Sequence, residues 1–215
     1  MESNTYTAED INLFAYPARI LIAGFSNSGK SYLCTELIRE NHSKFDKILY
    51  CSVSNHELEH DKEISGKLTV SHEILDPFEY VEGDNQSILL VLDDCFLEAI
   101  ENKAIVNAFT KGRHKRISIL FLSQNMYANG KFSRSIALNC SHFILMKIRD
   151  LSQVELLGRQ IYGKKKASEF VDIYKKALSY QKFGHLLVDL APHTPEILQL
   201  RTNITSDIQR VFTFS

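Results

Sequence analysis

One segment near the N-terminus carries the residue types and spacing of a phosphate-binding loop. Gly24, Gly29, Lys30 and Ser31 stand at the fixed positions of the pattern GxxxxGK[ST]. In such a P-loop the glycines let successive backbone N–H groups turn inward toward phosphate oxygens. The Lys30 ammonium then lies against the β- and γ-phosphates, and the Ser31 hydroxyl ligates Mg²⁺. A glycine-rich turn that binds nothing is disfavoured, because a strand-like apolar run precedes the pattern and a helical period follows it.

We therefore expect a nucleoside triphosphate and Mg²⁺ at this segment. The N-terminus of the following helix adds its dipole to the same anion site. The residues predicted to bind the nucleotide are Gly24, Phe25, Ser26, Asn27, Ser28, Gly29, Lys30, Ser31 and Tyr32.

A pair of carboxylates closes a later apolar run. Asp93 and Asp94 follow the sequence ILLVL, which is the Walker B pattern. We expect Asp93 to hold Mg²⁺ through a water, and Asp94 to orient or deprotonate the water that attacks the γ-phosphate. Many ATPases carry Glu where Asp94 stands, and the shorter side chain reaches less far. The alternative, that Asp94 caps a helix beginning at Cys95, remains open.

A polar sequence ends another apolar run. Ser123, Gln124 and Asn125 follow ISILFL. An amide at the end of a strand beside the P-loop can reach both the γ-phosphate and the attacking water. Gln124 is the first candidate for this role, and a polar loop without a catalytic function is the alternative.

A basic cluster precedes the strand that ends at Gln124. Five of the six residues 111–116 (KGRHKR) are basic or potentially basic. They are expected at the opposite edge of the sheet from their own chain's nucleotide, where an arginine can serve a neighbouring subunit's γ-phosphate. Arg113 is the first choice and Arg116 the second. A solvated charge run and contacts to nucleic acid phosphates are the alternatives. His114 lacks a His or Cys partner at metal-ligand spacing.

Short apolar runs alternate with amphipathic stretches along the chain. The runs have strand length and are mostly apolar at consecutive positions, as strands covered on both faces are; they span 19–24, 47–53, 88–92, 117–122, 142–146 and 185–188. The predicted helices span 31–39, 95–109, 151–162 and 167–180. A further short strand is expected at 67–70. This order predicts an α/β fold, with a mostly parallel sheet and helices on both faces. We expect one domain over 1–215, with a short polar lead at 1–15.

The amino-acid composition excludes several classes of protein. The 215 residues include 25 Lys and Arg against 26 Asp and Glu, for a net charge of −1. This balance excludes a uniformly basic protein that coats nucleic acid by bulk charge. The four cysteines lack CxxC spacing and are expected to be free thiols in a reducing compartment. No signal peptide or membrane-spanning segment is expected. The lysine run 164–166 is expected to be solvated.

The stretch 112–125 (GRHKRISILFLSQN) resembles one family of P-loop proteins in particular. It resembles the corresponding segment of FtsK–HerA-type viral genome-packaging ATPases, the group of poxvirus-like, Polinton-like, virophage and adintovirus packaging ATPases. The resemblance extends from about 19 to 204 and includes residues 133–139, 142–146, 149–153, 159–162, 185–190 and 200–204. A GTP switch is disfavoured, because Asn102-Lys103 lacks the acid of a guanine-reading NKxD motif.

The resemblance implies a RecA-like P-loop NTPase with extra C-terminal strands, using ATP and Mg²⁺. It implies a homo-oligomeric ring, a pentamer or hexamer, that translocates double-stranded DNA into a preformed capsid beside a capsid vertex protein. Its place would be the cytoplasm or nucleus of the infected host cell, or the virion. Arg113 matches the trans-acting arginine of the family and Gln124 its sensor glutamine, whereas Arg201 has no assigned role. Two alternatives remain: a monomeric nucleoside or metabolite kinase, and an ATP-dependent assembly factor that does not translocate.

Overall fold

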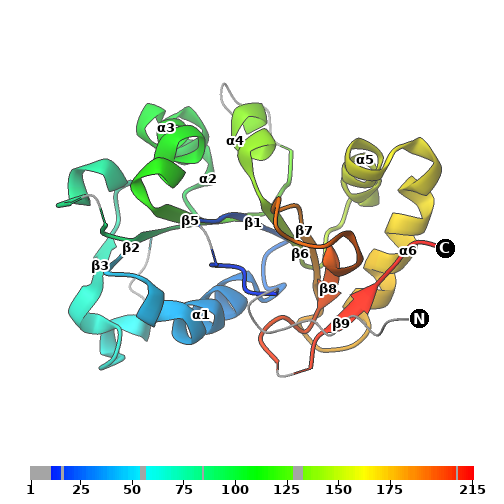
Figure 1. Cartoon of the computed structure of the whole chain (residues 1–215), viewed down its shortest axis with the longest axis horizontal. Coiled ribbons are helices and arrows are strands. Elements are labelled where there is room, and N and C mark those ends of the chain that lie inside the picture. The colour runs from blue at the N-terminus through cyan, green and yellow to red at the C-terminus, as the bar shows by residue number, and fades with distance from the viewer. Residues whose placement is uncertain (1–10, 16, 54–56, 84, 128–132, 207) are drawn as a thin grey trace.

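A nine-stranded sheet runs through the computed structural model, which describes residues 11–15, 17–53, 57–83, 85–127, 133–206 and 208–215. The strand order is β3-β2-β4-β5-β1-β6-β7-β8-β9 (Figure 1). The strands are β1 (Arg19–Ala23), β2 (Lys47–Ser52), β3 (Leu68–Ser71), β4 (Ile88–Asp93), β5 (Ile117–Ser123), β6 (His142–Leu145), β7 (Leu186–Asp189), β8 (Leu200–Thr202) and β9 (Arg210–Phe212). All seven strand segments expected from the sequence are present.

Helices cover both faces of the sheet, as predicted (Figure 1). They are α1 (Lys30–Asn41), α2 (Phe96–Glu101), α3 (Lys103–Lys111), α4 (Ser133–Asn139), α5 (Leu151–Tyr162) and α6 (Ala167–Leu178). The α1 helix packs on one face, and the other helices contribute to a second core on the opposite face. Across the described ranges, no helix is long and apolar enough to cross a membrane.

The direction of the strands changes beyond β6. The strands β3, β2, β4, β5, β1 and β6 are parallel, whereas β7, β8 and β9 pair antiparallel. Two helices, α5 and α6, lie between β6 and β7 and pack against each other. A helix pair returns the chain to the sheet edge that it left, so β7 runs opposite to β6. The prediction of a mostly parallel sheet with extra C-terminal strands is therefore confirmed.

The prediction of a single helix over 95–109 is wrong, because the chain forms two helices, α2 and α3, with a break at Asn102. The backbone of Asn102 is extended, with φ −86° and ψ 120°. Its Oδ1 atom accepts a hydrogen bond of 2.8 Å from the backbone N–H of Ala104 and so caps α3. Asparagine favours this arrangement, since its side chain competes with helical hydrogen bonds in the interior and satisfies them at the N-cap.

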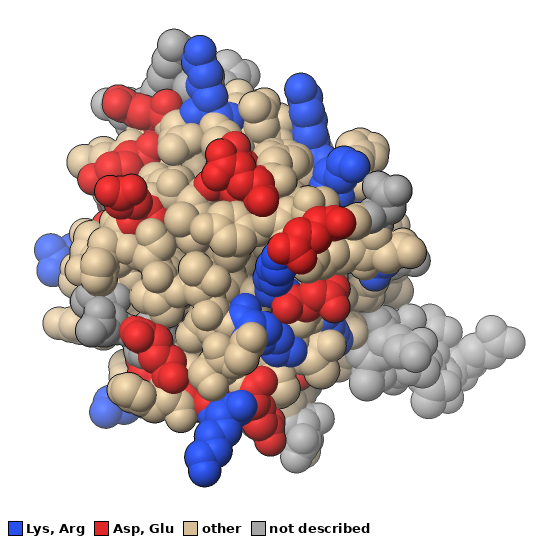
Figure 2. Space-filling model, turned by 90° about the vertical axis from the view of Figure 1, so that its left-hand side faces the viewer, with Lys and Arg blue, Asp and Glu red and all other residues tan. Residues whose placement is uncertain are grey.

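The predictions that the four cysteines are free thiols and that the lysine run is solvated are confirmed. The four cysteines are buried and free. Residues 164–166 form an exposed 3₁₀ turn, η6 (Lys164–Lys166), at the start of α6. On the face at the β3 edge, acidic and basic side chains are interspersed, as the near-zero net charge leads one to expect (Figure 2).

Candidate nucleotide-binding site

The P-loop, Asp93, Asp94 and Gln124 converge at the carboxyl edge of three adjacent strands. The sheet order places β5 between β1 and β4. Ala23 pairs with Ser123 at the ends of β1 and β5, and Phe121 of β5 pairs with Leu92 of β4. The P-loop, the sensor amide and the carboxylate pair follow these strand ends. Parallel alignment therefore gathers residues far apart in the sequence at one edge, where α/β sheets commonly bind ligands.

The P-loop (residues 24–31) is held between β5 and β6. The backbone N–H of Gly24 donates to the Ser123 carbonyl at 3.0 Å, and the N–H of Phe25 donates to the Lys147 carbonyl at 3.0 Å. A Cβ at position 24 would lie 2.6 Å from the Ser28 Oγ atom, so glycine is needed there. Gly29 has φ +97°, in the left-handed region that glycine adopts without a steric penalty. Ser28 Oγ is buried and has no hydrogen-bond partner among the described residues.

Lys30 points its ammonium along the inside of the loop. The side chain is buried, and Nζ donates to the carbonyls of Gly24 at 2.9 Å and Phe25 at 3.2 Å. Burial lowers the pKa of Lys30, and the negative charges of Asp94 and Asp93 partly oppose that shift. Both carboxylates are thus close enough to act on the lysine, as a site for a metal-bound triphosphate requires.

Asp93 is a buried carboxylate oriented by a neighbouring strand. It ends β4, and its Oδ2 atom accepts a hydrogen bond of 2.9 Å from the hydroxyl of Tyr50 on β2. Burial raises the pKa of Tyr50, as do the neighbouring Cys34 thiol and the charge of Asp93, so the hydroxyl remains a donor. The sequence did not identify Tyr50, because a tyrosine inside an apolar run looks like a core residue.

Asp93 and Ser31 fit a magnesium ion. Mg²⁺ prefers oxygen ligands and uses one or two protein groups together with substrate phosphates and waters. In the described part of the chain, no group of three or more His, Cys, Asp or Glu side chains could hold a metal ion. A metal here would therefore also need ligands from phosphates and waters. A carboxylate and a hydroxyl are therefore the expected protein contribution, with phosphate oxygens supplying the rest.

Asp94 is exposed and has a left-handed backbone, with φ +55°. The alternative that it caps α2 is excluded, because the N-cap residue is Cys95, which makes no side-chain cap. A left-handed backbone is uncommon outside glycine and is tolerated best by Asn and Asp. Such conformations cluster at functional sites.

Gln124 borders two cavities at this edge. One, of about 400 Å³, is also lined by Asp94, and the other, of about 210 Å³, is also lined by Ser26 of the P-loop. Ser123 is buried, and its Oγ accepts from the Asn125 N–H at 3.1 Å in a tight turn that leaves Gln124 exposed. Asn125 is exposed too and lines both cavities, so Gln124 and Asn125 are both placed to reach the loop and Asp94, whereas Ser123 is buried.

Arg149 is a cation at the same edge that the sequence did not single out for catalysis. It follows β6, and its guanidinium carbon lies 5.2 Å from the centre of the Phe25 ring. It lines the 210 Å³ cavity with Ser26 and Gln124. The sequence feature that could have identified Arg149 is its position just after β6, the strand that pairs with β1 before the P-loop.

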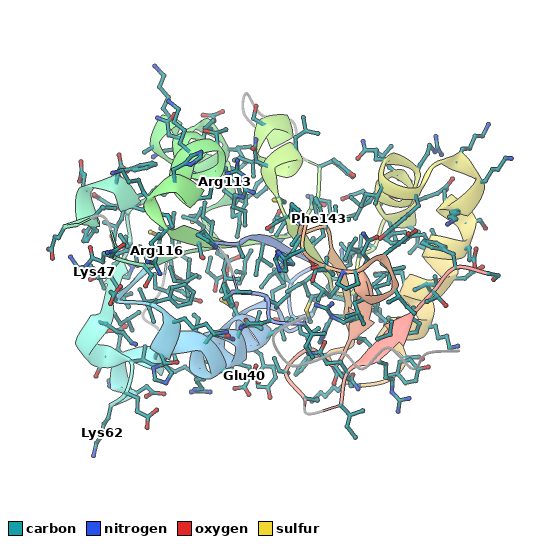
Figure 3. All side chains as sticks on the ribbon, viewed as in Figure 1. Glu40, Lys47, Lys62, Arg113, Arg116 and Phe143 are labelled. Atoms are coloured by element: carbon teal, nitrogen blue, oxygen red, sulfur yellow. The ribbon has the colours of Figure 1, made fainter. Side chains whose placement is uncertain are left out.

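Arg113 and Arg116 lie at the amino edge of β5, far from the P-loop of their own chain. Seven residues of β5 separate the two edges, which corresponds to roughly 20 Å. Both side chains are exposed (Figure 3). Arg113 lies within the 3₁₀ turn η5 (Gly112–Lys115), and Arg116 directly follows this turn. Arg113 lines a cavity of about 440 Å³ with Arg19 and His114. Arg116 is one of the charges that, after hydrogen bonds from Ser87, lower the pKa of Asp46.

Arg201 belongs to the protein core. It is fully buried, and its Nη2 atom lies 2.9 Å from Oδ2 of Asp189, whose Oδ1 lies 3.2 Å from Nε2 of His142. Burial alone would raise the pKa of Asp189, but the hydrogen bond and charge of His142 and the charge of Arg201 lower it to about 2. This network joins β6, β7 and β8, so Arg201 has a structural role.

The fold and this edge together define a P-loop NTPase with a RecA-like, mostly parallel sheet. The chain belongs to the Poxvirus A32 protein family, which it matches over residues 7–189. The resemblance to poxvirus-like proteins seen in the sequence is thereby confirmed.

Solved structures from two Sulfolobus turreted icosahedral viruses share this fold. The genome packaging NTPase B204 of Sulfolobus turreted icosahedral virus 2, in complex with ATP-gammaS, is 16% identical, with a TM-score of 0.57 over 83% of this chain and 95% of that one. The DNA-packaging ATPase B204 of Sulfolobus turreted icosahedral virus is 15% identical, with a TM-score of 0.56 over 92% and 98%. No curated protein sequence matches the chain.

Proposed function

We propose that this protein hydrolyses ATP to translocate double-stranded viral DNA into a preformed capsid. The observation that carries the proposal is the convergence of the P-loop, Asp93, Asp94 and Gln124 at one edge of the sheet. Membership of the Poxvirus A32 family supports it. So does the shared fold of B204, which is described as a genome packaging NTPase and a DNA-packaging ATPase.

In this proposal the P-loop N–H groups and Lys30 bind the triphosphate, and Asp93 and Ser31 hold Mg²⁺. When bound, the metal supplies positive charge to the phosphate oxygens. Asp94 positions the attacking water and accepts its proton, and Gln124 orients the same water toward the γ-phosphate. The exposed carboxylate of Asp94 and its shared cavity with Gln124 support this division of roles.

Two arginines complete the site from different chains. Arg149 would contact the γ-phosphate side of its own chain's nucleotide, because it shares a cavity with Ser26 and Gln124. Arg113 would act on the nucleotide of the next subunit in a ring of five or six, since it is exposed at the opposite edge. Arg113 is preferred to Arg116, whose charge already acts on Asp46 within its own chain. An arginine acting in trans couples hydrolysis to assembly.

The domain organisation, the compartment and the capsid partner are proposed from membership of the family. The whole chain would act as one domain in the infected cell, in the cytoplasm or nucleus or with the virion, and dock on a capsid vertex protein. The preference for ATP over other nucleotides is also taken from the family.

ATP turnover measured with and without double-stranded DNA tests the proposal. A motor is stimulated by DNA and forms rings, whereas a metabolite kinase ignores DNA and phosphorylates a small acceptor. An assembly factor binds ATP with negligible turnover. The variant Asp94→Asn should bind nucleotide and hydrolyse it at least about 100-fold more slowly, if the carboxylate acts as a general base. Asparagine is suited to the left-handed backbone at this position, so the change alters chemistry more than conformation.

A further inference from the structure

An aromatic side chain is exposed beside the P-loop. Tyr32 directly follows Ser31 in the first turn of α1, and 58% of its surface is accessible. Large exposed aromatic rings commonly mark a binding surface, because burying the ring against a ligand is favourable. Tyr32 therefore lies next to the residues proposed to bind the phosphates.

A second ring, Phe183, pairs with Tyr32 from a distant part of the sequence. Their centroids lie 5.6 Å apart, with the ring planes inclined at 41°. Phe183 also packs on Gly29, where a Cβ would come within 2.7 Å of the phenyl ring. The loop between α6 and β7 brings Phe183 to this edge, because the helix pair returns the chain to the edge where the P-loop lies.

The position of Phe183 is fixed by a tight turn. The N–H of Gly184 donates to the carbonyl of Gln181 at 3.0 Å. A Cβ at Gly184 would lie 2.2 Å from the carbonyl oxygen of Leu178, so the turn packs closely on the end of α6. The aromatic pair is therefore organised before any ligand binds, which lowers the entropic cost of binding.

A cavity of about 510 Å³ lies between Phe183 and the phosphate loop. Asn27 and Ser28 of the loop line it together with Phe183, whereas Tyr32 is not part of its lining. The charged side chains in its lining are all cationic, namely Lys147, Lys175 and Lys182. Aromatic and cationic groups next to a phosphate site suit the remainder of a nucleotide, whose base is aromatic and whose phosphates are anionic.

We propose that the base of the bound nucleotide packs on the Tyr32–Phe183 pair. This inference rests on the proposed nucleotide-binding function and adds the residues that hold the base. Tyr32 supplies the exposed ring, and Phe183 supports it against Gly29. Contact with ring faces depends on ring size, so purine nucleotides bind more tightly than pyrimidine nucleotides.

Calorimetric titrations of a non-hydrolysable ATP analogue and of tripolyphosphate, both with Mg²⁺, test this assignment. Tripolyphosphate keeps the phosphates but has no base. We expect Tyr32→Ala to weaken binding of the analogue roughly 10-fold while tripolyphosphate binding is unchanged. Tyr32→Phe keeps the ring and should restore tight binding. Tyr180→Ala is the matched control, because Tyr180 is also partly exposed but pairs with Phe212.

An equal loss for both ligands in Tyr32→Ala would overturn the inference, since the residue would then only shape the P-loop. Unchanged binding of the analogue would overturn it as well, as would tighter binding of UDP than of ADP to the wild type. A wild type that binds neither ligand would overturn both the inference and the proposed function. Tight binding of the analogue without DNA-stimulated turnover would count against the proposed function alone.

Discussion

The hydroxyl of Tyr50 on β2 donates a hydrogen bond of 2.9 Å to the Asp93 carboxylate at the end of β4. The two strands are neighbours, and Ser52 and Asp93 are paired at their carboxyl ends. The bond fixes one oxygen of a buried carboxylate beside the P-loop. Groups that orient a metal ligand in this way typically change metal affinity or activity 10- to 100-fold when removed.

Tyr50→Phe should therefore lower Mg²⁺-dependent ATP turnover about 10-fold and raise the Mg²⁺ concentration needed for half-maximal turnover. Tyr162→Phe removes a tyrosine hydroxyl that has no hydrogen-bond partner among the described residues, and should leave both quantities unchanged. Steady-state turnover across a Mg²⁺ series measures the effect. If Tyr50→Phe behaves like the control, Tyr50 serves only to pack the core.

Mixed rings test whether Arg113 acts on a neighbouring subunit. Lys30→Ala removes a subunit's own site but keeps its Arg113, whereas Arg113→Ala keeps the site and removes the arginine. Each variant alone should lose at least about 90% of turnover, because a trans-acting arginine contributes a factor of 10³ or more. Mixing the two should recover activity at interfaces that combine an intact site with an intact arginine. Absence of recovery in stable mixed rings would refute action in trans by Arg113.

Arg149 should behave differently in the same experiment. Its guanidinium lies over Phe25 of its own P-loop, so the two groups belong to one chain. We expect Arg149→Ala to lower kcat by about 10- to 100-fold, and mixing it with Lys30→Ala should not restore turnover. Lys166→Ala is the control, since Lys166 is also an exposed cation beside an aromatic ring, but that ring is Phe214 rather than Phe25 of the P-loop. Recovery in the mixture would place Arg149 at the neighbouring subunit's site.

Burial of His185 predicts how stability depends on pH. Burial lowers the pKa of His185 to about 4, from an ordinary value of about 6.5. Below pH 6.5 the unfolded chain binds a proton that the folded chain does not, so stability falls as the pH drops from about 6.5 to about 4. The loss should reach about 3 kcal/mol. Urea unfolding at pH 7 and pH 5 should show about 2 kcal/mol of this loss.

His185→Gln should flatten this pH dependence, whereas His60→Gln, at an exposed position, should not. Asp189 contributes at lower pH, because its folded pKa is lowered to about 2. Its stabilising effect is complete above an ordinary carboxyl pKa and is lost as the pH falls toward 2. A wild-type stability that is the same at pH 7 and pH 5 would contradict the assignment of His185.

The central strands could be predicted because strands buried on both faces are apolar at consecutive positions. The short strands β8 and β9 could not be delimited, since three residues carry no period and pairing with neighbours defines them. The break at Asn102 depends on one capping side chain within an otherwise helical pattern.

The candidate site was predictable where a local pattern encodes it, as in the P-loop and the carboxylate pair. Tyr50, Arg149 and Phe183 were not, because their relation to the site depends on which strands and turns become neighbours in space. Tyr50 on β2 contacts Asp93 on the neighbouring strand β4. Phe183 contacts Gly29 because β7 runs antiparallel to β6 and so begins at the edge where the P-loop lies. Single-sequence patterns report local periodicity and do not report such neighbours.

Displacement of a third strand from a DNA triplex tests the central claim most directly. A translocating motor that reaches the triplex on double-stranded DNA displaces the third strand in proportion to ATP hydrolysed. The account predicts displacement by the wild type with ATP, and none by Asp94→Asn or with a non-hydrolysable analogue. DNA-stimulated ATP turnover by the wild type that leaves the triplex intact would contradict it.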